Sequence, residues 1–364
     1  MRRLLKFGLF LLPVFIIPIT INGIKINIRD ARELFFQSLM IVGLALLIKN
    51  KWIKGFLVWA TVSWWFNYFL PPQSTAVLFN IFFGFFLFYL IREFVNFADI
   101  DGILKIVCLT ALFQVFWMGI QLVGKDPFWH PITCTGARIF DKPVHIVGWL
   151  GNTNILGAYL AFCLLLFRVY FKKFILFILA GLIVTRSTTA VIAAFSGLMC
   201  FEFFTAKDYK KLIKLFLISI GVLILFFVFI EKTDNLRFEV WRKLLAQTFN
   251  WRCLIGQGLG RFQNLRIVHQ NTVWDNPHNE YLNIYFELGI VGLVFVFGYL
   301  LGLFRRFLKY KTDKSILLFS CIMVVLVESL GMFPFQVATT AFLAITYFAL
   351  LEKCLHHQNI LLES

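Results

Sequence analysis

Apolar runs of about 17–22 residues recur along the whole chain, and short polar or charged segments separate them. Each run is long enough to cross a hydrocarbon core of ~30 Å as a helix. The pattern predicts an all-α, polytopic membrane protein, in which residues 1–364 form one membrane domain of about twelve spans. The expected spans are roughly 4–21, 34–48, 56–70, 75–91, 103–123, 149–171, 174–186, 188–205, 212–230, 281–304, 315–333 and 337–351.

Lys and Arg in the short loops predict the orientation of these spans. The basic loops alternate with loops that lack Lys and Arg, such as 71–75 and 334–336. Because basic loops stay on the cytoplasmic side, we expect both termini there and the alternate loops outside. The opening MRRLLKFGLFLLPVFIIPITI is similar to a signal peptide, but no small-residue cleavage site follows it, so we take it as the first span.

Composition agrees with a membrane protein, because 60% of the residues are hydrophobic and the chain contains 46 Phe. The formal net charge is +16. Basic patches that alternate with spans are typical of anchors to the inner leaflet. With no soluble basic domain in view, we expect contact with membrane lipids and no nucleic-acid binding.

Two segments on the expected outer side are long, 124–148 and 231–280, and the second contains more Lys and Arg than Asp and Glu. Its charge favours an anion bound at the outer membrane surface, although a solvated loop or contact with lipid phosphates would also explain it. Cys134 and Cys253 lie one in each segment. A disulfide between them is possible in an oxidising compartment, and coincidence explains the pattern as well.

The most polar cluster of the chain stands where the tenth span begins. Asn is a good N-cap and Pro suits the first helical position, so we expect the helix to start at Asn276 and Pro277. His278 would then lie in the first turn, beside free N–H groups that favour anions. Asn279, Asn283 and Glu287 follow at helical spacing. This stripe predicts either a functional site or a polar seam between helices.

Four segments resemble motifs of the O-antigen ligase/polymerase superfamily, in the same order along the chain. PHNEYLNIYFELGIVGL resembles the signature Pro-His-Asn at a span entrance followed by Glu-x-Gly-x-x-Gly-Leu. The match covers 148–293 well. The other three segments are GWLGNTNILGAYLA, with Asn152 and Asn154; TRSTTA, with Arg186 before Ser187 where the family has Ser-Arg; and RFEVWRKLLAQTFNWRCLIGQGLGRF, with Arg237, Trp241, Gly256, Gly258 and Phe262.

The resemblance implies a GT-C-like, metal-independent, inverting glycosyltransferase that needs no cofactor. It would move a glycan from undecaprenyl diphosphate to an acceptor hydroxyl, on lipid A–core or another glycan acceptor, at the outer (periplasmic) face of the bacterial inner membrane. Arg186 and Arg237 would bind the diphosphate through bidentate bonds. His278 would accept the acceptor's proton or hydrogen-bond the phosphate. The expected substrate-binding residues are Asn152, Asn154, Arg242, Arg261, Asn279, Glu280 and Glu287.

Two other functions compete with the ligase. A surface-polysaccharide polymerase of the same superfamily needs the same donor chemistry, so the sequence separates the two poorly. A transporter would require paired charges near the bilayer midplane and repeated halves. We find no repeats, and the charged residues noted within the expected spans are Arg168, Glu287 and Glu328.

No metal site is expected. Asp99–Asp101 is similar to an Asp-x-Asp metal motif, but it falls in a short inner loop that we interpret as solvated. His130, His145 and His269 lie on the outer side without the spacing of a zinc site.

Overall fold

The computed structural model describes residues 50–66, 73–123, 126, 137–139, 142–144, 146–206, 236–248, 250–262, 267–269, 272–274 and 276–363. The long helices are α3 (Lys51–Phe66), α4 (Gln73–Phe94), α5 (Ile100–Leu122), α6 (Thr153–Tyr170), α7 (Ile175–Val184), α8 (Thr188–Thr205), α10 (Leu236–Thr248), α13 (Glu280–Lys309), α14 (Asp313–Glu328) and α15 (Ala338–Glu363). The shorter elements are α11 (Arg252–Ile255), the 3-10 turns η1 (Phe97–Asp99), η2 (Gly148–Leu150) and η3 (Lys172–Phe174), and the strands β1 (Ala137–Ile139), β2 (Lys142–Val144), β3 (Ile267–His269) and β4 (Thr272–Trp274).

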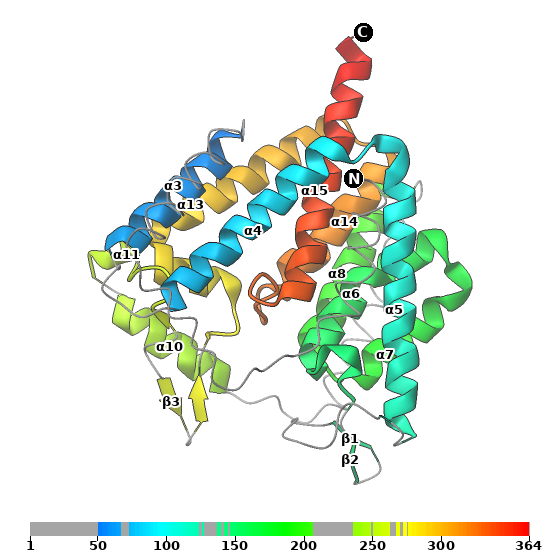
Figure 1. The fold of residues 1–364 in the computed structure, drawn as a ribbon, viewed down its shortest axis with the longest axis horizontal. Helices are drawn as coiled ribbons and strands as arrows, with labels where there is room; N and C mark the ends of the chain where they lie inside the picture. The colour runs from blue at the N-terminus through cyan, green and yellow to red at the C-terminus, as the bar shows by residue number, and fades with distance from the viewer. Residues whose placement is uncertain are drawn as a thin grey trace.

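The described helices form two groups that α15 joins (Figure 1). In one group α13 packs along α3, beside α4; in the other, α14 packs on α8 and α6, and α6 packs on α5 and α7. Helix α15 packs against α4, α14 and α6. Buried side chains from α4, α5, α6, α8, α14 and α15 form one large apolar core. Tyr347 of α15 crosses this core and donates its hydroxyl to the Phe162 carbonyl of α6, at 2.9 Å.

The all-α prediction is confirmed for the described residues, apart from two short hairpins. Strand β1 pairs antiparallel with β2, and β3 with β4. Six of the described helices are long and apolar enough to cross a membrane: Ala76–Phe94, Phe97–Leu122, Thr153–Tyr170, Thr188–Thr205, Glu280–Lys309 and Ala338–Glu363. The total of twelve stays a prediction, and the expected spans 4–21, 34–48 and 212–230 lie outside the described residues.

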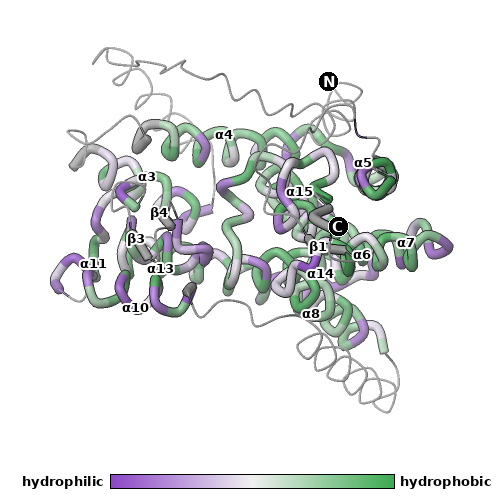
Figure 2. Tube along the Cα trace, turned by 90° about the horizontal axis from the view of Figure 1, so that it is seen from below, coloured by the Kyte–Doolittle hydropathy of each residue, from purple (hydrophilic) through white to green (hydrophobic). Residues whose placement is uncertain are grey.

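The described parts of the two long outer segments lie at the same end of the molecule. Hairpin β1–β2, α10 and β3 lie in the lower part of Figure 1, with α11 above them at the left, whereas α15 ends at the opposite pole. Seen from below, α10 and α11 carry hydrophilic stretches, while apolar residues predominate along α4 and α5 (Figure 2). This arrangement agrees with spans that alternate in direction. Cys134 lies outside the described residues, so its pairing with Cys253 stays a prediction.

Among the described residues, three ion pairs tie helices together. Arg168 in the last turn of α6 pairs with Glu202 near the end of α8. Arg306 in the last turn of α13 makes two bonds to the Glu352 carboxylate, at 2.5 and 2.6 Å. Asp101 lies in the first turn of α5 rather than in a loop, and it accepts from Tyr170 and Lys314, at 2.6 and 2.9 Å. All these contacts link neighbouring helices and stand apart from the polar cluster around His278.

Candidate functional site

Helix α13 is broken at Gly289. This residue has φ 69° and ψ −168°, which divides the helix into 280–288 and 290–309. Such a conformation is essentially restricted to glycine because a Cβ would clash with the backbone. At the break, the carbonyl groups of the first half lose their helical partners and must be satisfied elsewhere.

The outer loop supplies those partners. The N–H of Gln257 donates to the Phe286 carbonyl at 2.7 Å, and the N–H of Gly258 donates to the Glu287 carbonyl at 3.0 Å. On the other side, the Trp59 indole of α3 donates to the Leu288 carbonyl at 2.8 Å. The break in α13 is therefore filled by hydrogen bonds from both the outer loop and a neighbouring helix.

The glycines of the two motifs meet backbone to backbone. A Cβ added at Gly256 would lie 2.2 Å from the Glu287 carbonyl oxygen, and one added at Gly289 would lie 2.3 Å from the Leu254 oxygen. The carboxylate of Glu287 accepts from the N–H groups of Gly260 and Phe262. The Gly-x-Gly segment and the Glu-x-Gly segment, distant in sequence, thus form one interlocked unit.

The entrance of α13 differs from the sequence prediction. The helix begins at Glu280 with Asn279 as N-cap, whose side chain accepts from the Leu282 N–H at 3.0 Å. Asn276 instead accepts from the His278 N–H at 3.1 Å, in a turn that precedes the helix. A start at Asn276 and Pro277 was wrong because His278 adopts φ 49°, a left-handed conformation that separates this turn from the helix.

One turn between α14 and α15 receives donors from three parts of the site. The Glu280 N–H donates to the Ser329 carbonyl at 2.9 Å, and the Asn279 amide donates to the Leu330 carbonyl at 2.9 Å. The Arg237 guanidinium of α10 donates to the Gly331 carbonyl at 3.0 Å. Because consecutive Cα atoms are ~3.8 Å apart, these three anchor points lie within about 8 Å of each other.

His278 is held between α10 and the α14–α15 turn. Its ring packs edge to face on Phe333, with centroids 5.0 Å apart, and Trp241 of α10 donates to the Pro277 carbonyl at 2.7 Å. Burial, together with the positive charge of Arg237, lowers the pKa of His278 from 6.5 to about 4. The imidazole is therefore neutral near pH 7 and can give one hydrogen bond and accept one.

Glu328, at the end of α14, lies under the positive charge of Arg237. Its carboxylate is fully buried, with 0% of the residue exposed, and Arg237 attracts it. Sequence reasoning noted Glu328 only as a charge within a span and missed Gly331 and Phe333 altogether. The sequence did contain a signal for this site, which is a carboxylate at the end of a span followed by a turn with Gly, Phe and Pro. Such a carboxylate is costly in a membrane unless it has a functional role.

Arg186 lies in the short turn between α7 and α8, with φ 54° and an exposed side chain. This turn adjoins the α14–α15 turn, since a Cβ added at Gly331 would lie 2.7 Å from Thr189 Cγ2. It also packs on α6, where a Cβ at Gly157 would lie 2.7 Å from Ser187 Cβ. The structure thus brings the Arg186 motif to the Arg237–Gly331 contact.

The remaining predicted residues fall into two sets. Asn152 is the N-cap of α6, and its side chain accepts from the Asn154 N–H at 2.8 Å. Both residues therefore serve to begin that helix. Arg242 is exposed on α10, and Arg261 donates to the Gln257 carbonyl at 3.4 Å. No contact that the structure describes ties Arg242 or Arg261 to the α14–α15 turn.

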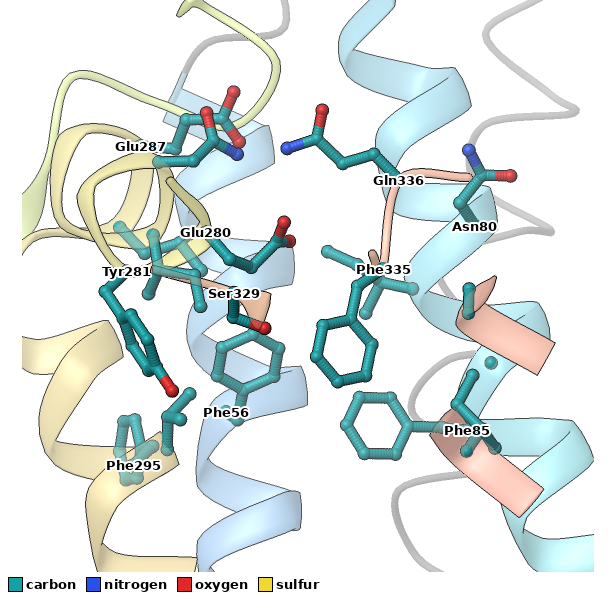
Figure 3. Close-up of a pocket in the computed structure, with 18 of the residues that line it drawn as sticks. Phe56, Asn80, Phe85, Glu280, Tyr281, Glu287, Phe295, Ser329, Phe335 and Gln336 are labelled. Carbon is teal, nitrogen blue, oxygen red and sulfur yellow. The ribbon is translucent and has the colours of Figure 1, made fainter. Parts of the chain in front are cut away.

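A cavity of about 420 Å³ lies between α3, α4, α13 and α15, next to His278. Phe333 forms part of its wall and also contacts His278. Figure 3 shows polar side chains at one end, including Glu280 and Gln336, and aromatic side chains such as Phe56 and Phe85 farther along. None of the described lining residues is Lys, Arg or His. The polar residues in the wall are Asn80, Glu280, Asn283, Glu287, Ser329 and Gln336.

Residues 173–297 match the sequence model of the O-antigen ligase family. Over these residues the chain is similar to that family. The superfamily resemblance found in the motifs is thereby confirmed. The matched residues include Arg186, Arg237, His278 and the interlocked unit at Gly289. No curated protein matches the chain.

Proposed function

We propose that the protein is an O-antigen ligase-like, metal-independent, inverting glycosyltransferase. It takes a glycan from undecaprenyl diphosphate and transfers it to an acceptor hydroxyl, on lipid A–core or a similar glycan acceptor. The reaction takes place at the outer face of the bacterial inner membrane. The membrane helices and the O-antigen ligase domain support this class of activity.

The observation that carries the proposal is the contact of Arg237 and His278 with one turn. Arg237 is positioned by a hydrogen bond to the Gly331 carbonyl, in the turn whose Phe333 contacts His278. A guanidinium suits a diphosphate because its planar fork gives parallel bonds to two phosphate oxygens. Arg186, in the adjoining turn, would provide a second guanidinium for the same group.

The chemical role of these residues is to stabilise the leaving group. As the bond between the sugar and the diphosphate breaks, negative charge grows on the phosphate oxygen. A fixed donor aimed at such a charge is worth about 10²–10³ in rate. His278, neutral because of its low pKa of about 4, would donate a hydrogen bond to the phosphate rather than serve as a strong base.

A polymerase of the same superfamily remains the second candidate, because it would use the same donor and the same cationic residues. Analysis of lipid-linked sugars in a deletion strain separates the two. A ligase defect leaves long chains on the lipid carrier, whereas a polymerase defect leaves single repeat units. If neither accumulates, the proposed transfer is contradicted and a transporter becomes the better hypothesis.

A further inference from the structure

The carboxylate of Glu280 stands out among the buried polar groups of the cavity. Glu280 is 7% exposed, and its Oε2 atom is buried without a hydrogen-bond partner among the described residues. The side chain forms part of the cavity wall and points into the space between α13 and α4 (Figure 3). A buried carboxylate oxygen without a donor is costly, so its presence at a cavity indicates a ligand that supplies one.

Glu287 is the other carboxylate of the cavity wall, and its role differs. It already accepts from the N–H groups of Gly260 and Phe262 and so holds the outer loop in place. Glu280 makes a side-chain contact with Gln336, which leaves Oε2 available. Of these two carboxylates, Glu280 is therefore the one that a substrate hydroxyl can reach as a donor.

Phe333 connects the cavity that contains Glu280 to the ring of His278. The ring of His278 contacts Phe333 outside the cavity, while Phe333 and Glu280 both line it. Since the described lining has no Lys, Arg or His, a diphosphate has no counter-charge inside the cavity. A neutral hydroxyl beside a hydrocarbon chain does match the wall, because the polar groups gather at one end and the aromatic groups at the other (Figure 3).

We propose that Glu280 is the catalytic base of the transfer, and that the acceptor hydroxyl reaches it through the cavity between α3, α4, α13 and α15. This rests on the proposed function. An inverting displacement needs the nucleophile on the side opposite to the leaving group, so the donor sugar would lie between Glu280 and the pair Arg237 and His278.

The step balances as follows. The acceptor oxygen forms a bond to the anomeric carbon of the donor sugar, and its proton passes to Glu280 Oε2. The bond between the anomeric carbon and the phosphate oxygen breaks, and its electron pair leaves with the diphosphate. Arg237 and His278 stabilise the charge that this oxygen gains. The acceptor is thus an amphiphile whose reacting hydroxyl is uncharged.

Several charged groups surround Glu280 and bear on any titration. Glu287 lies on the same helix, Glu328 ends α14, and His278, which Arg237 influences, contacts Phe333. Helices α3, α4 and α15 contribute only neutral side chains to the described cavity wall. Among these groups, the structure gives Glu280 alone a carboxylate oxygen that is both buried at the cavity and unbonded within the described residues.

The test measures transfer by the full-length protein in detergent, with a defined polyprenyl-diphosphate-linked donor and a glycolipid acceptor. We expect Glu280→Gln to lower kcat by about 10²–10⁴ with the donor KM unchanged, and to remove the acid limb of the pH profile. The matched control is Glu93→Gln, the same change at a half-exposed residue at the end of α4. An inactive wild-type protein would contradict the proposed function. An active wild type with an equally active Glu280→Gln variant would contradict only the assignment of Glu280 as the base.

Two further measurements complete the test. Gly84 lines the cavity in α4, so Gly84→Leu narrows it and should raise the KM of the acceptor while the KM of the donor stays the same. A rise in the donor KM instead would overturn the cavity as the acceptor site. Loss of the acid limb in His278→Asn, with the limb kept in Glu280→Gln, would assign the base to His278 and overturn the proposal.

Discussion

The guanidinium of Arg237 donates to the main-chain carbonyl of Gly331 across 94 residues of sequence, at 3.0 Å. The contact fixes the position of the guanidinium, whose planar fork suits phosphate oxygens. Removal of that fork is therefore the most direct test of the anion site.

We expect Arg237→Lys to reduce transfer by about 10²-fold or more, since a Lys ammonium cannot bond Gly331 and give a parallel pair of bonds to phosphate. The measurement is the initial rate of glycan transfer by purified protein. Arg305→Lys, at an exposed position near the inner end of α13, is the matched control and should keep full activity. Full activity in Arg237→Lys would show that this residue contributes only to the overall positive charge of the loop.

The pH dependence tests the protonation state of His278. Its pKa falls to about 4, so the imidazole is neutral from pH 5 upward, and no His278 titration should appear between pH 5 and 8. We expect His278→Ala to abolish transfer while the protein still inserts, and His278→Asn to keep part of the rate through its amide donor. The residual pH profile of His278→Asn should match the wild-type shape above pH 5. A profile that changes near pH 6.5 would show that the ring carries a charge there.

The same shift has a consequence for stability. Because the folded pKa lies below the unfolded value of 6.5, the unfolded state binds the proton more tightly. Stability should therefore decrease as the pH falls from 6.5 towards 4, and His278→Asn should flatten this part of the curve. Thermal unfolding in detergent at several pH values measures it. A variant with the wild-type slope would contradict the buried, neutral state of the ring.

The break in α13 predicts that a Gly→Ala substitution has opposite effects on stability at Gly289 and at Gly302. Gly289→Ala places a Cβ 2.3 Å from the Leu254 carbonyl in a strained conformation, so it should destabilise the protein by about 1–3 kcal/mol or more. Gly302→Ala, in the intact part of the same helix, meets nothing within 4 Å and should stabilise it by about 0.5–1 kcal/mol. Melting temperatures that move in the same direction would argue against the interlocked unit.

Trp241 offers a test of positioning. Its indole N–H donates to the Pro277 carbonyl at 2.7 Å and so holds the backbone next to His278. Trp241→Phe should therefore cause a large loss of kcat with a small change in the melting temperature. Trp251→Phe, the same change at an exposed ring, is the control. If Trp241→Phe raises only the donor KM, then Trp241 contacts the donor and does not act through His278.

The elements that depend on local patterns were predictable from the sequence. Spans of unbroken apolar residues and the turn at Arg186 lie where the pattern indicated. The start of α13 was wrong because Asn276 and Asn279 are both good caps, and only the left-handed conformation of His278 decides between them. Glu287 and Gly289 were recognised as a motif, but their hydrogen-bonded contact with the Gly256–Phe262 loop is a long-range pairing that no local signal encodes.

The partners of Arg237 illustrate the same limit. Gly331 and Phe333 belong to a turn of ordinary composition, and their importance arises from which side chains reach them through space. The positive charge of the outer loop indicated an anion, but charge alone did not distinguish Arg237 from Arg242, which the structure leaves exposed on α10.

The carbonyl groups that lose their helical partners at Gly289 imply an order in which parts of the protein fold during biosynthesis. Residues 257–262 leave the ribosome before the helix whose break they fill, and the Trp59 partner is made earlier still. This part of the exported loop therefore cannot reach its final shape until the later helix has entered the bilayer and lies against α3. Maturation of the exterior surface should follow integration of the membrane helices, so protease resistance of this loop in a pulse-labelled chain reports when the membrane assembly is finished.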